Sequence, residues 1–309
     1  MNETLRSRAA IGRALAVGVP LSLGVLVVLL GVRERSTATA VEWRSSIDLA
    51  PEQARAERRP QMWFFAMADR PAGESMEKVF QDPDVVEATR SFAAIRVDGG
   101  TEVEVESPGS PGPAGPQGLS VLVKTAEGDV IAERAGFVDA PALVGFLERA
   151  RAMHEPMIVA LGLVRERPRP DSKAQLAVLY EELENWAAAE DIHREIVESL
   201  DVDDANPRTL WSNSMERLAR IQVLTGRSAE ARESLSRLQQ LGEVDPERAL
   251  RTRLTEALVL FIERRVNEAL ALLGAEIPAT LAQADRRLWH RTKSRVQAEA
   301  RLLSDSRSR

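Results

Sequence analysis

The chain has 309 residues, of which 44% are hydrophobic and 4% aromatic, and its formal net charge is −6. At about 150 residues per domain this length predicts two domains, and the acidic balance argues against a general nucleic-acid binder, which needs a basic face. The sequence contains no cysteine, which excludes disulfides, cysteine-ligated zinc and cysteine-based redox chemistry.

The first part of the chain contains an uncharged apolar run, ALAVGVPLSLGVLVVLLGV, at residues 14–32. As a helix this run spans about 28 Å, close to the hydrocarbon thickness of a bilayer. It predicts a transmembrane signal anchor between a short tail, residues 1–13, and a polar connector, residues 33–40. A cleaved signal peptide, with an A-x-A-like site at residues 38–40, and a buried core helix are the alternatives.

Arginines flank the apolar run equally on both sides, so their count does not set an orientation. The tail before the run is short and the following part is large, which favours a cytoplasmic N-terminus. The expected localisation is therefore a single-pass membrane protein with its bulk on the extracytoplasmic, periplasmic side.

The next part of the chain alternates short helical and strand patterns. In chain order the sequence predicts helix 50–58, strand 61–68, helix 74–90 with a break near Pro83, strand 91–98, strands 119–125 and 130–137 joined by a hairpin turn, and helix 141–153.

This order resembles a thioredoxin-like domain over residues 41–153. The residues that carry the resemblance are Trp43, the run Phe64–Ala66, the segment Met76–Phe80, Asp98 at the end of its strand and Gly128 in the hairpin. The resemblance implies a turn with two reactive cysteines directly after strand 61–68.

Neither cysteine is present at the implied positions. Depending on the alignment, these positions fall at Asp69 and Ala72 or at Arg70 and Gly73, and the cis-proline typical of the family falls near Leu119. The resemblance therefore predicts a redox-inactive module without a cofactor or metal.

A charged, proline-containing stretch predicts a linker at residues 154–170, and an internal repeat follows over residues 171–309. Alanines recur at a spacing of twelve residues in three pairs whose starts are 42 and 38 residues apart: Ala177 and Ala189, Ala219 and Ala231, and Ala257 and Ala269. Small residues at such positions let the two helices of a hairpin approach closely. Four residues beyond the second alanine stand Leu235 and Leu273, but His193 in the first unit.

This pattern resembles three degenerate tetratricopeptide repeats, closed by a capping helix near residues 281–302. The resemblance implies a surface that binds a peptide or a partner protein. An irregular helical bundle with alanines at packing points is the alternative.

The sequence shows no catalytic motif. We expect each histidine to be a surface or packing residue and the glutamates near residue 182 to form a solvated helix face; these residues are His154, His193, His290, Glu181, Glu182 and Glu184.

The expected fold class is a multidomain α+α/β protein, with a transmembrane helix, a thioredoxin-like domain and an all-α repeat array. The expected function is a non-enzymatic, membrane-tethered interaction or scaffold protein that binds a protein or peptide partner through the array and binds no nucleic acid. The alternative is a thiol-independent enzyme or chaperone that uses the cleft beside Asp69 and Arg70.

Overall fold

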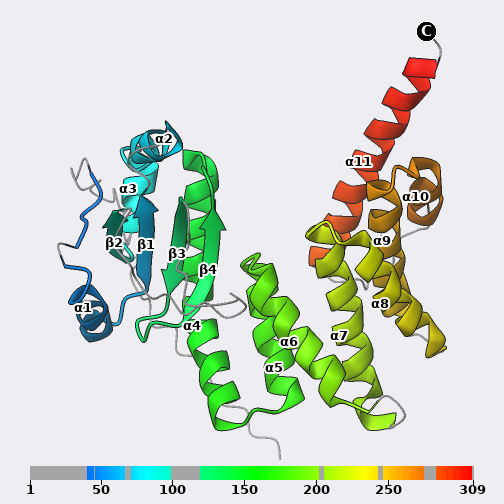
Figure 1. Ribbon diagram of the computed structural model, residues 1–309, viewed down its shortest axis with the longest axis horizontal. Coiled ribbons are helices and arrows are strands. Elements are labelled where there is room, and N and C mark those ends of the chain that lie inside the picture. The colour runs from blue at the N-terminus through cyan, green and yellow to red at the C-terminus, as the bar shows by residue number, and fades with distance from the viewer. Residues whose placement is uncertain are drawn as a thin grey trace, which may run out of the picture. The chain divides into compact units, whose positions relative to one another are not determined.

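The computed structural model describes residues 40–44, 46–66, 71–98, 119–201, 205–242, 246–274 and 283–307. All described residues belong to one compact unit within residues 38–309. This unit is a mixed α+β structure, in which a four-stranded sheet and its helices are followed by a helical region (Figure 1).

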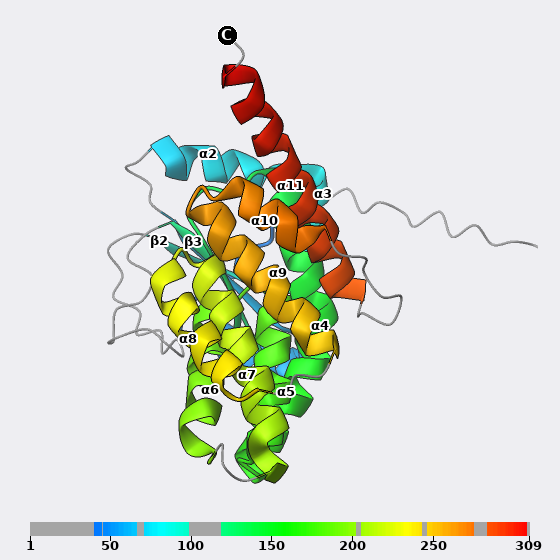
Figure 2. The same ribbon diagram turned by 90° about the vertical axis from the view of Figure 1, so that its right-hand side faces the viewer.

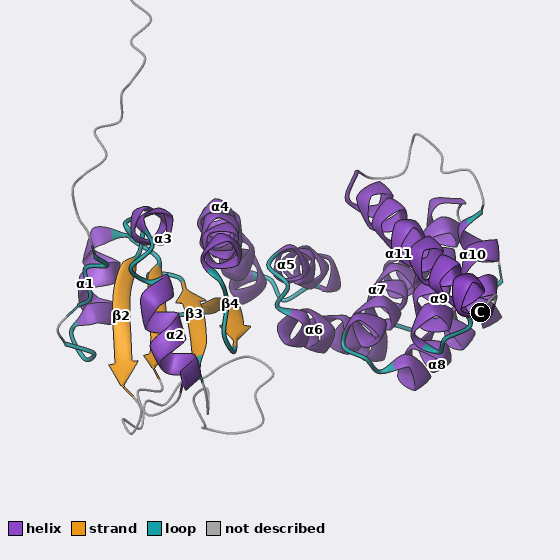
Figure 3. Ribbon diagram, turned by 90° about the horizontal axis from the view of Figure 1, so that it is seen from above, coloured by secondary structure: helices purple, strands orange, loops and turns teal. Residues whose placement is uncertain are grey.

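The strands of the sheet are β1 (Gln61–Ala66), β2 (Ala93–Asp98), β3 (Ser120–Lys124) and β4 (Val130–Ala135), in the order β2–β1–β3–β4. β1 pairs in parallel with β2 and antiparallel with β3, and β3 pairs antiparallel with β4 (Figure 3). Every residue of β1 is buried, as befits a central strand whose two faces are both covered. The expected strands and the expected β-hairpin are therefore present.

Four helices belong to this part of the chain: α1 (Ala50–Glu57), α2 (Pro71–Val79), α3 (Pro83–Thr89) and α4 (Ala140–Glu166). Alternate residues of β1 point to opposite faces of the sheet. Phe64 joins the larger core cluster, which includes residues of α2, α3 and α4, while Trp63 joins a smaller cluster that includes Ala50 of α1. The expected break near Pro83 separates α2 from α3, because the Asp82 side chain caps α3 by accepting a hydrogen bond from the Asp84 backbone N–H at 2.9 Å.

Helix α4 extends far beyond the helix expected to end at Met153. It begins at the N-cap Asp139, which accepts a hydrogen bond from Ala142, and runs to Glu166 through most of the expected linker 154–170. Its apolar face continues past the expected end, since Met157 and Ala160 are buried. Pro156 removes one backbone donor, but this proline lies on the exposed side, so the buried face continues without a break.

Among the described residues beyond α4 there are seven helices, and six of them form three helical hairpins. Hairpin 1 is α5 (Pro170–Glu182) with α6 (Trp186–Ser199), hairpin 2 is α7 (Ala205–Leu224) with α8 (Ser228–Gln240), hairpin 3 is α9 (Pro246–Ile262) with α10 (Val266–Leu273), and α11 (Gln283–Arg307) ends the series. Neighbouring hairpins pack side by side (Figures 1 and 2). We call α5–α11 the helical array.

The three hairpins share one turn geometry. Glu184, Gly226 and Arg264 each adopt a positive φ, of 57°, 83° and 63°. In each turn the following N–H bonds to the carbonyl five residues back, at 2.7–2.9 Å, which is the left-handed helix cap of a Schellman motif. The intervals between the three turns match the repeat intervals of 42 and 38 residues in the sequence.

The alanines of the sequence repeat lie inside the hairpins. All six have no exposed surface, namely Ala177, Ala189, Ala219, Ala231, Ala257 and Ala269. A methyl group at each of these positions leaves room for the facing helix, and a larger side chain would push the pair apart.

The sheet and hairpin 1 share one hydrophobic core. The cluster that contains Phe64 and Phe146 also contains Leu176, Tyr180 and Leu183 of hairpin 1. Helix α4 contacts α5 along this core. The helical array is thus continuous in packing with the sheet.

The structure contradicts the expected single-pass membrane protein. Within the described residues, no helix combines the length and the apolar character needed to cross a bilayer. Helices α4 and α11 are long, but charged residues interrupt both. Residues 14–32, on which the expectation was based, lie outside the described residues.

Candidate functional site

The positions of the missing redox motif are only partly described. Asp69 and Arg70 lie outside the described residues. Ala72 is exposed and Gly73 is buried in the first turn of α2, which begins at Pro71, earlier than expected, because proline is favoured at the start of a helix. Leu119 is buried directly before β3. Since the chain has no cysteine, cysteine-based thiol chemistry is excluded here.

The densest charged site lies in the helical array, around Glu181 near the end of α5. Its carboxylate contacts His193 Nε2 of α6 at 2.9 Å and accepts hydrogen bonds from Arg217 and Arg220 of α7 at 2.8 Å. Arg220 also donates to Asp285 of α11 at 3.1 Å. We call these five residues the Glu181 cluster. One carboxylate therefore joins three helices, and Arg220 extends the contact to a fourth.

The electrostatics of this cluster keep Glu181 ionised. Its side chain is 8% exposed and that of His193 is 1% exposed. Burial by itself raises the pKa of Glu181, but the hydrogen bond with His193 and the charges of Arg217 and Arg220 outweigh burial and lower this pKa to about 2. An ionised carboxylate only accepts hydrogen bonds, so His193 Nε2 is the hydrogen-bond donor in its contact with Glu181.

The Glu181 cluster occupies packing positions of the repeat. Glu181 and His193 are twelve residues apart, like the paired alanines, and the matching positions are Val223 with Leu235 in hairpin 2 and Phe261 with Leu273 in hairpin 3. The other two hairpins are therefore apolar where hairpin 1 holds a carboxylate and an imidazole.

The sequence interpretation of Glu181 as part of a solvated face is wrong, whereas Glu182 and Glu184 are exposed. His193 is a buried packing residue, as expected. The twelve-residue spacing was the signal that links Glu181 to His193. Nothing in the sequence indicates that Arg217 and Arg220 approach from the next hairpin.

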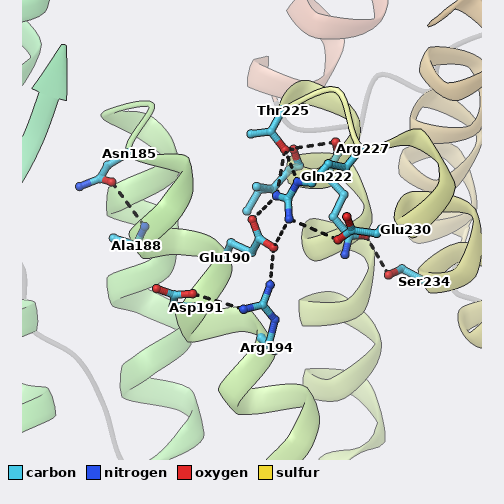
Figure 4. Close-up of polar contacts among 11 residues, drawn as sticks. Asn185, Ala188, Glu190, Asp191, Arg194, Gln222, Thr225, Arg227, Glu230 and Ser234 are labelled. Atoms are coloured by element: carbon cyan, nitrogen blue, oxygen red, sulfur yellow. Dashed lines mark hydrogen bonds and ion pairs between the residues drawn. The ribbon is translucent and has the colours of Figure 1, made fainter. Parts of the chain in front are cut away.

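A second buried carboxylate, Glu190 of α6, joins hairpin 1 to the turn of hairpin 2. The Glu190 side chain is 8% exposed and points between two guanidinium groups, Arg194 at 2.5 Å and Arg227 at 2.8 Å (Figure 4). Arg227 also donates to the Thr225 hydroxyl at 3.1 Å. The ion pair between Glu190 and Arg227 holds the α7–α8 turn against α6.

The contact between the second helix of hairpin 2 and the turn of hairpin 3 has the opposite polarity. Arg232 of α8 donates to Glu263 in the α9–α10 turn, at 2.7 Å through Nε. Between hairpins 1 and 2, by contrast, the acid Glu190 is on the helix and the base Arg227 is in the turn. The ion pairs thus distinguish the two junctions.

The first hairpin is also held to the sheet by polar contacts. The Tyr180 hydroxyl donates to the Val130 carbonyl at 3.3 Å, and Arg134 of β4 donates to Glu184 at 2.7 Å. Burial, together with the nearby charge of Asp129, raises the pKa of Tyr180 to about 12, so this phenol stays protonated and remains a donor.

The ion pairs of Glu181 and Glu190 connect neighbouring helices and are not arranged for proton transfer. Glu181 and Glu190 each accept hydrogen bonds from two guanidinium groups, and each carboxylate joins hairpin 1 to hairpin 2.

Two surface cavities lie elsewhere. One of about 280 Å³ adjoins Trp43, Arg59 and Arg90 beside the sheet, and one of about 380 Å³ adjoins Arg232 and Leu260 in the array. Residues of the Glu181 cluster line neither cavity.

No protein-family description and no curated protein sequence matches the chain.

Proposed function

We propose that the chain is a non-enzymatic scaffold that binds a partner protein through its helical array, with hairpins of the tetratricopeptide type. The observation that carries this proposal is the threefold recurrence of one hairpin with one left-handed turn, at Glu184, Gly226 and Arg264. Repeated hairpins that pack on their neighbours present a continuous surface, and arrays of this kind serve as binding surfaces.

The packing of the two ends supports the proposal. A terminal repeat has an apolar face that needs a cover. Hairpin 1 is covered by α4 and the sheet through Leu176, Tyr180 and Leu183, and hairpin 3 is covered by α11 through Trp289 and Val296. We propose that the sheet is a thioredoxin-like module that serves as the N-terminal cover of the array instead of a redox enzyme.

The shared core decides which experiment is informative. Removal of residues 171–309 would expose the apolar residues of α4 that contact hairpin 1, so loss of binding could reflect misfolding. Site-specific photo-crosslinking of the full chain avoids this problem. A photoreactive residue is placed at Thr209 or Asn213 of α7, and a matched one at exposed Ala72 of α2.

We expect the α7 probes to crosslink a discrete partner in native extract and the Ala72 probe to crosslink none. A partner captured from Ala72 but not from α7 would refute the proposal and would favour the region next to Asp69 and Arg70.

A further inference from the structure

Helix α11 carries a run of cations without an acid. Residues 286–298 contain five basic residues and no Asp or Glu, although acids outnumber bases in the chain as a whole. These five residues, which we call the basic face of α11, are Arg286, Arg287, Arg291, Lys293 and Arg295. The same helix buries Trp289, Thr292 and Val296 against the array, so its cations lie on the remaining surface, and Arg287, Arg291 and Arg295 are exposed.

The basic face differs from the parts of the array where cations meet acids. Arg194, Arg227 and Arg232 each pair with a glutamate, whereas Arg237 lies over the Trp211 ring. Among the described residues, by contrast, Arg286, Arg287, Arg291 and Lys293 pair with no acidic group. Arg295 instead lies over the Phe261 ring, 5.7 Å from its centroid.

This arrangement costs stability. Arg287 and Arg291, and Arg291 and Arg295, are like-charged neighbours at a spacing of four, which destabilises a helix by about 0.2–0.5 kcal/mol per pair. Arg286 also lies in the first turn of α11, where the helix dipole disfavours cations. A covering helix that only needs to be soluble would carry charges of both signs. Residues 286–298 carry one sign only, and the acids that flank them, Asp285 and Glu299, pair with Arg220 and Arg264 of other helices, which favours a binding surface on this stretch.

We propose that the basic face of α11 binds an acidic polypeptide segment of the partner protein. This inference rests on the proposed scaffold function and specifies the chemistry of the partner. Charge complementarity favours an acidic ligand. A single-stranded nucleic acid would use exposed aromatic rings for stacking, but Trp289 is fully buried. An anionic bilayer would use exposed large apolar residues beside the cations, but Val296 is buried, Leu288 is half-buried, and the exposed Leu302 lies seven residues beyond Arg295, outside the basic face.

The test measures binding of a fluorescent oligoglutamate peptide to the full chain by anisotropy at low salt. The variant is the charge reversal Arg287→Glu with Arg291→Glu, which removes two exposed cations that have no acidic partner in the described structure. The matched control reverses Arg149 and Arg151 on the exposed side of α4, because this double variant has the same net charge.

We expect the α11 variant to bind the peptide at least about tenfold more weakly and the α4 control to stay within about twofold of the wild type. Binding of the wild type should also weaken as salt increases. Thermal unfolding should show that the α11 variant is no less stable than the wild type, since the substitution relieves repulsion between like charges.

The inference is overturned if the wild type does not bind the peptide, or if both double variants lose binding equally. Tighter binding of a single-stranded oligonucleotide or of anionic vesicles than of the peptide would overturn it as well. If the α7 probes still crosslink a partner in any of these cases, the scaffold function stands and only the assignment to α11 fails.

Discussion

Replacement of Glu181 by glutamine tests whether the Glu181 cluster stabilises the array. The substitution keeps the shape of the side chain and removes the charge that Arg217 and Arg220 contact at 2.8 Å. Removal of one partner from a buried ion pair typically costs about 3–5 kcal/mol, because the remaining charges stay buried. Glu181→Gln should therefore strongly lower the free energy of unfolding.

The pKa of Glu181 gives a second value for the stability that this carboxylate contributes. The pKa of Glu181 is about 2 in the folded protein, against an ordinary value of 4.5, and linkage turns this difference into about 3 kcal/mol of stability at neutral pH. This value agrees with the loss of about 3–5 kcal/mol expected when one partner of a buried ion pair is removed. For a chain of this size the melting temperature should fall by about 6–12 °C.

The sign of the pH dependence follows from the lowered pKa. A carboxyl group with a depressed pKa stabilises the fold above the unfolded-state pKa, near 4.5, and loses this contribution as the pH falls towards 2. The difference between wild type and Glu181→Gln should be constant above about pH 5 and should shrink below about pH 4.

The assay is urea unfolding followed by circular dichroism from pH 7 down to pH 3. The matched control is Glu182→Gln at the exposed neighbouring position, which should change stability by less than about 0.5 kcal/mol. If Glu181→Gln is as stable as this control, or if its deficit is the same at every pH, the assigned role of the buried carboxylate is wrong.

Two further predictions concern packing and the turns. Ala231→Leu should lower the free energy of unfolding by about 1–3 kcal/mol, because Ala231 has no exposed surface at a close helix contact. The control Ala229→Leu, on the exposed side of α8, should leave stability nearly unchanged. Equal unfolding midpoints of the two variants in urea would contradict the hairpin packing. Gly226→Ala should lower the free energy of unfolding by about 1 kcal/mol, because residue 226 has a φ of 83°. Gly162→Ala inside α4, where an added Cβ meets no atom within 4 Å, should instead raise this free energy by about 0.5–1 kcal/mol. Differential scanning calorimetry of both glycine variants checks these signs, and two shifts in the same direction would count against the left-handed cap.

Local patterns predicted the elements well because local chemistry determines them. The β1 strand and the break between α2 and α3 follow from an apolar run and from the Asp82–Pro83 cap. The twelve-residue alanine spacing indicated the hairpins, because that spacing is a property of one helix–turn–helix unit.

Features that depend on distant partners were not predicted. The proline and charges near the end of α4 suggested a linker, but burial of Met157 and Ala160 against hairpin 1 keeps that stretch helical. Glu181 was interpreted as solvated, because its partner Arg220 stands 39 residues away in sequence. The candidate turn at Asp69 and Arg70 lies outside the described residues, so its interpretation stays untested.

The opposite polarity of the two junctions restricts how the array can change length. Hairpin 2 carries a base both in its turn, at Arg227, and on its second helix, at Arg232. If hairpin 2 were duplicated in tandem, Arg232 of the first copy would face Arg227 of the second, and no glutamate equivalent to Glu190 would join the two copies, because the acid that Arg227 keeps, Glu230, belongs to its own hairpin. We therefore expect duplication of this unit to give an unstable array unless one of the two arginines also changes to an acid. The number of hairpins is thereby tied to the order of their charges.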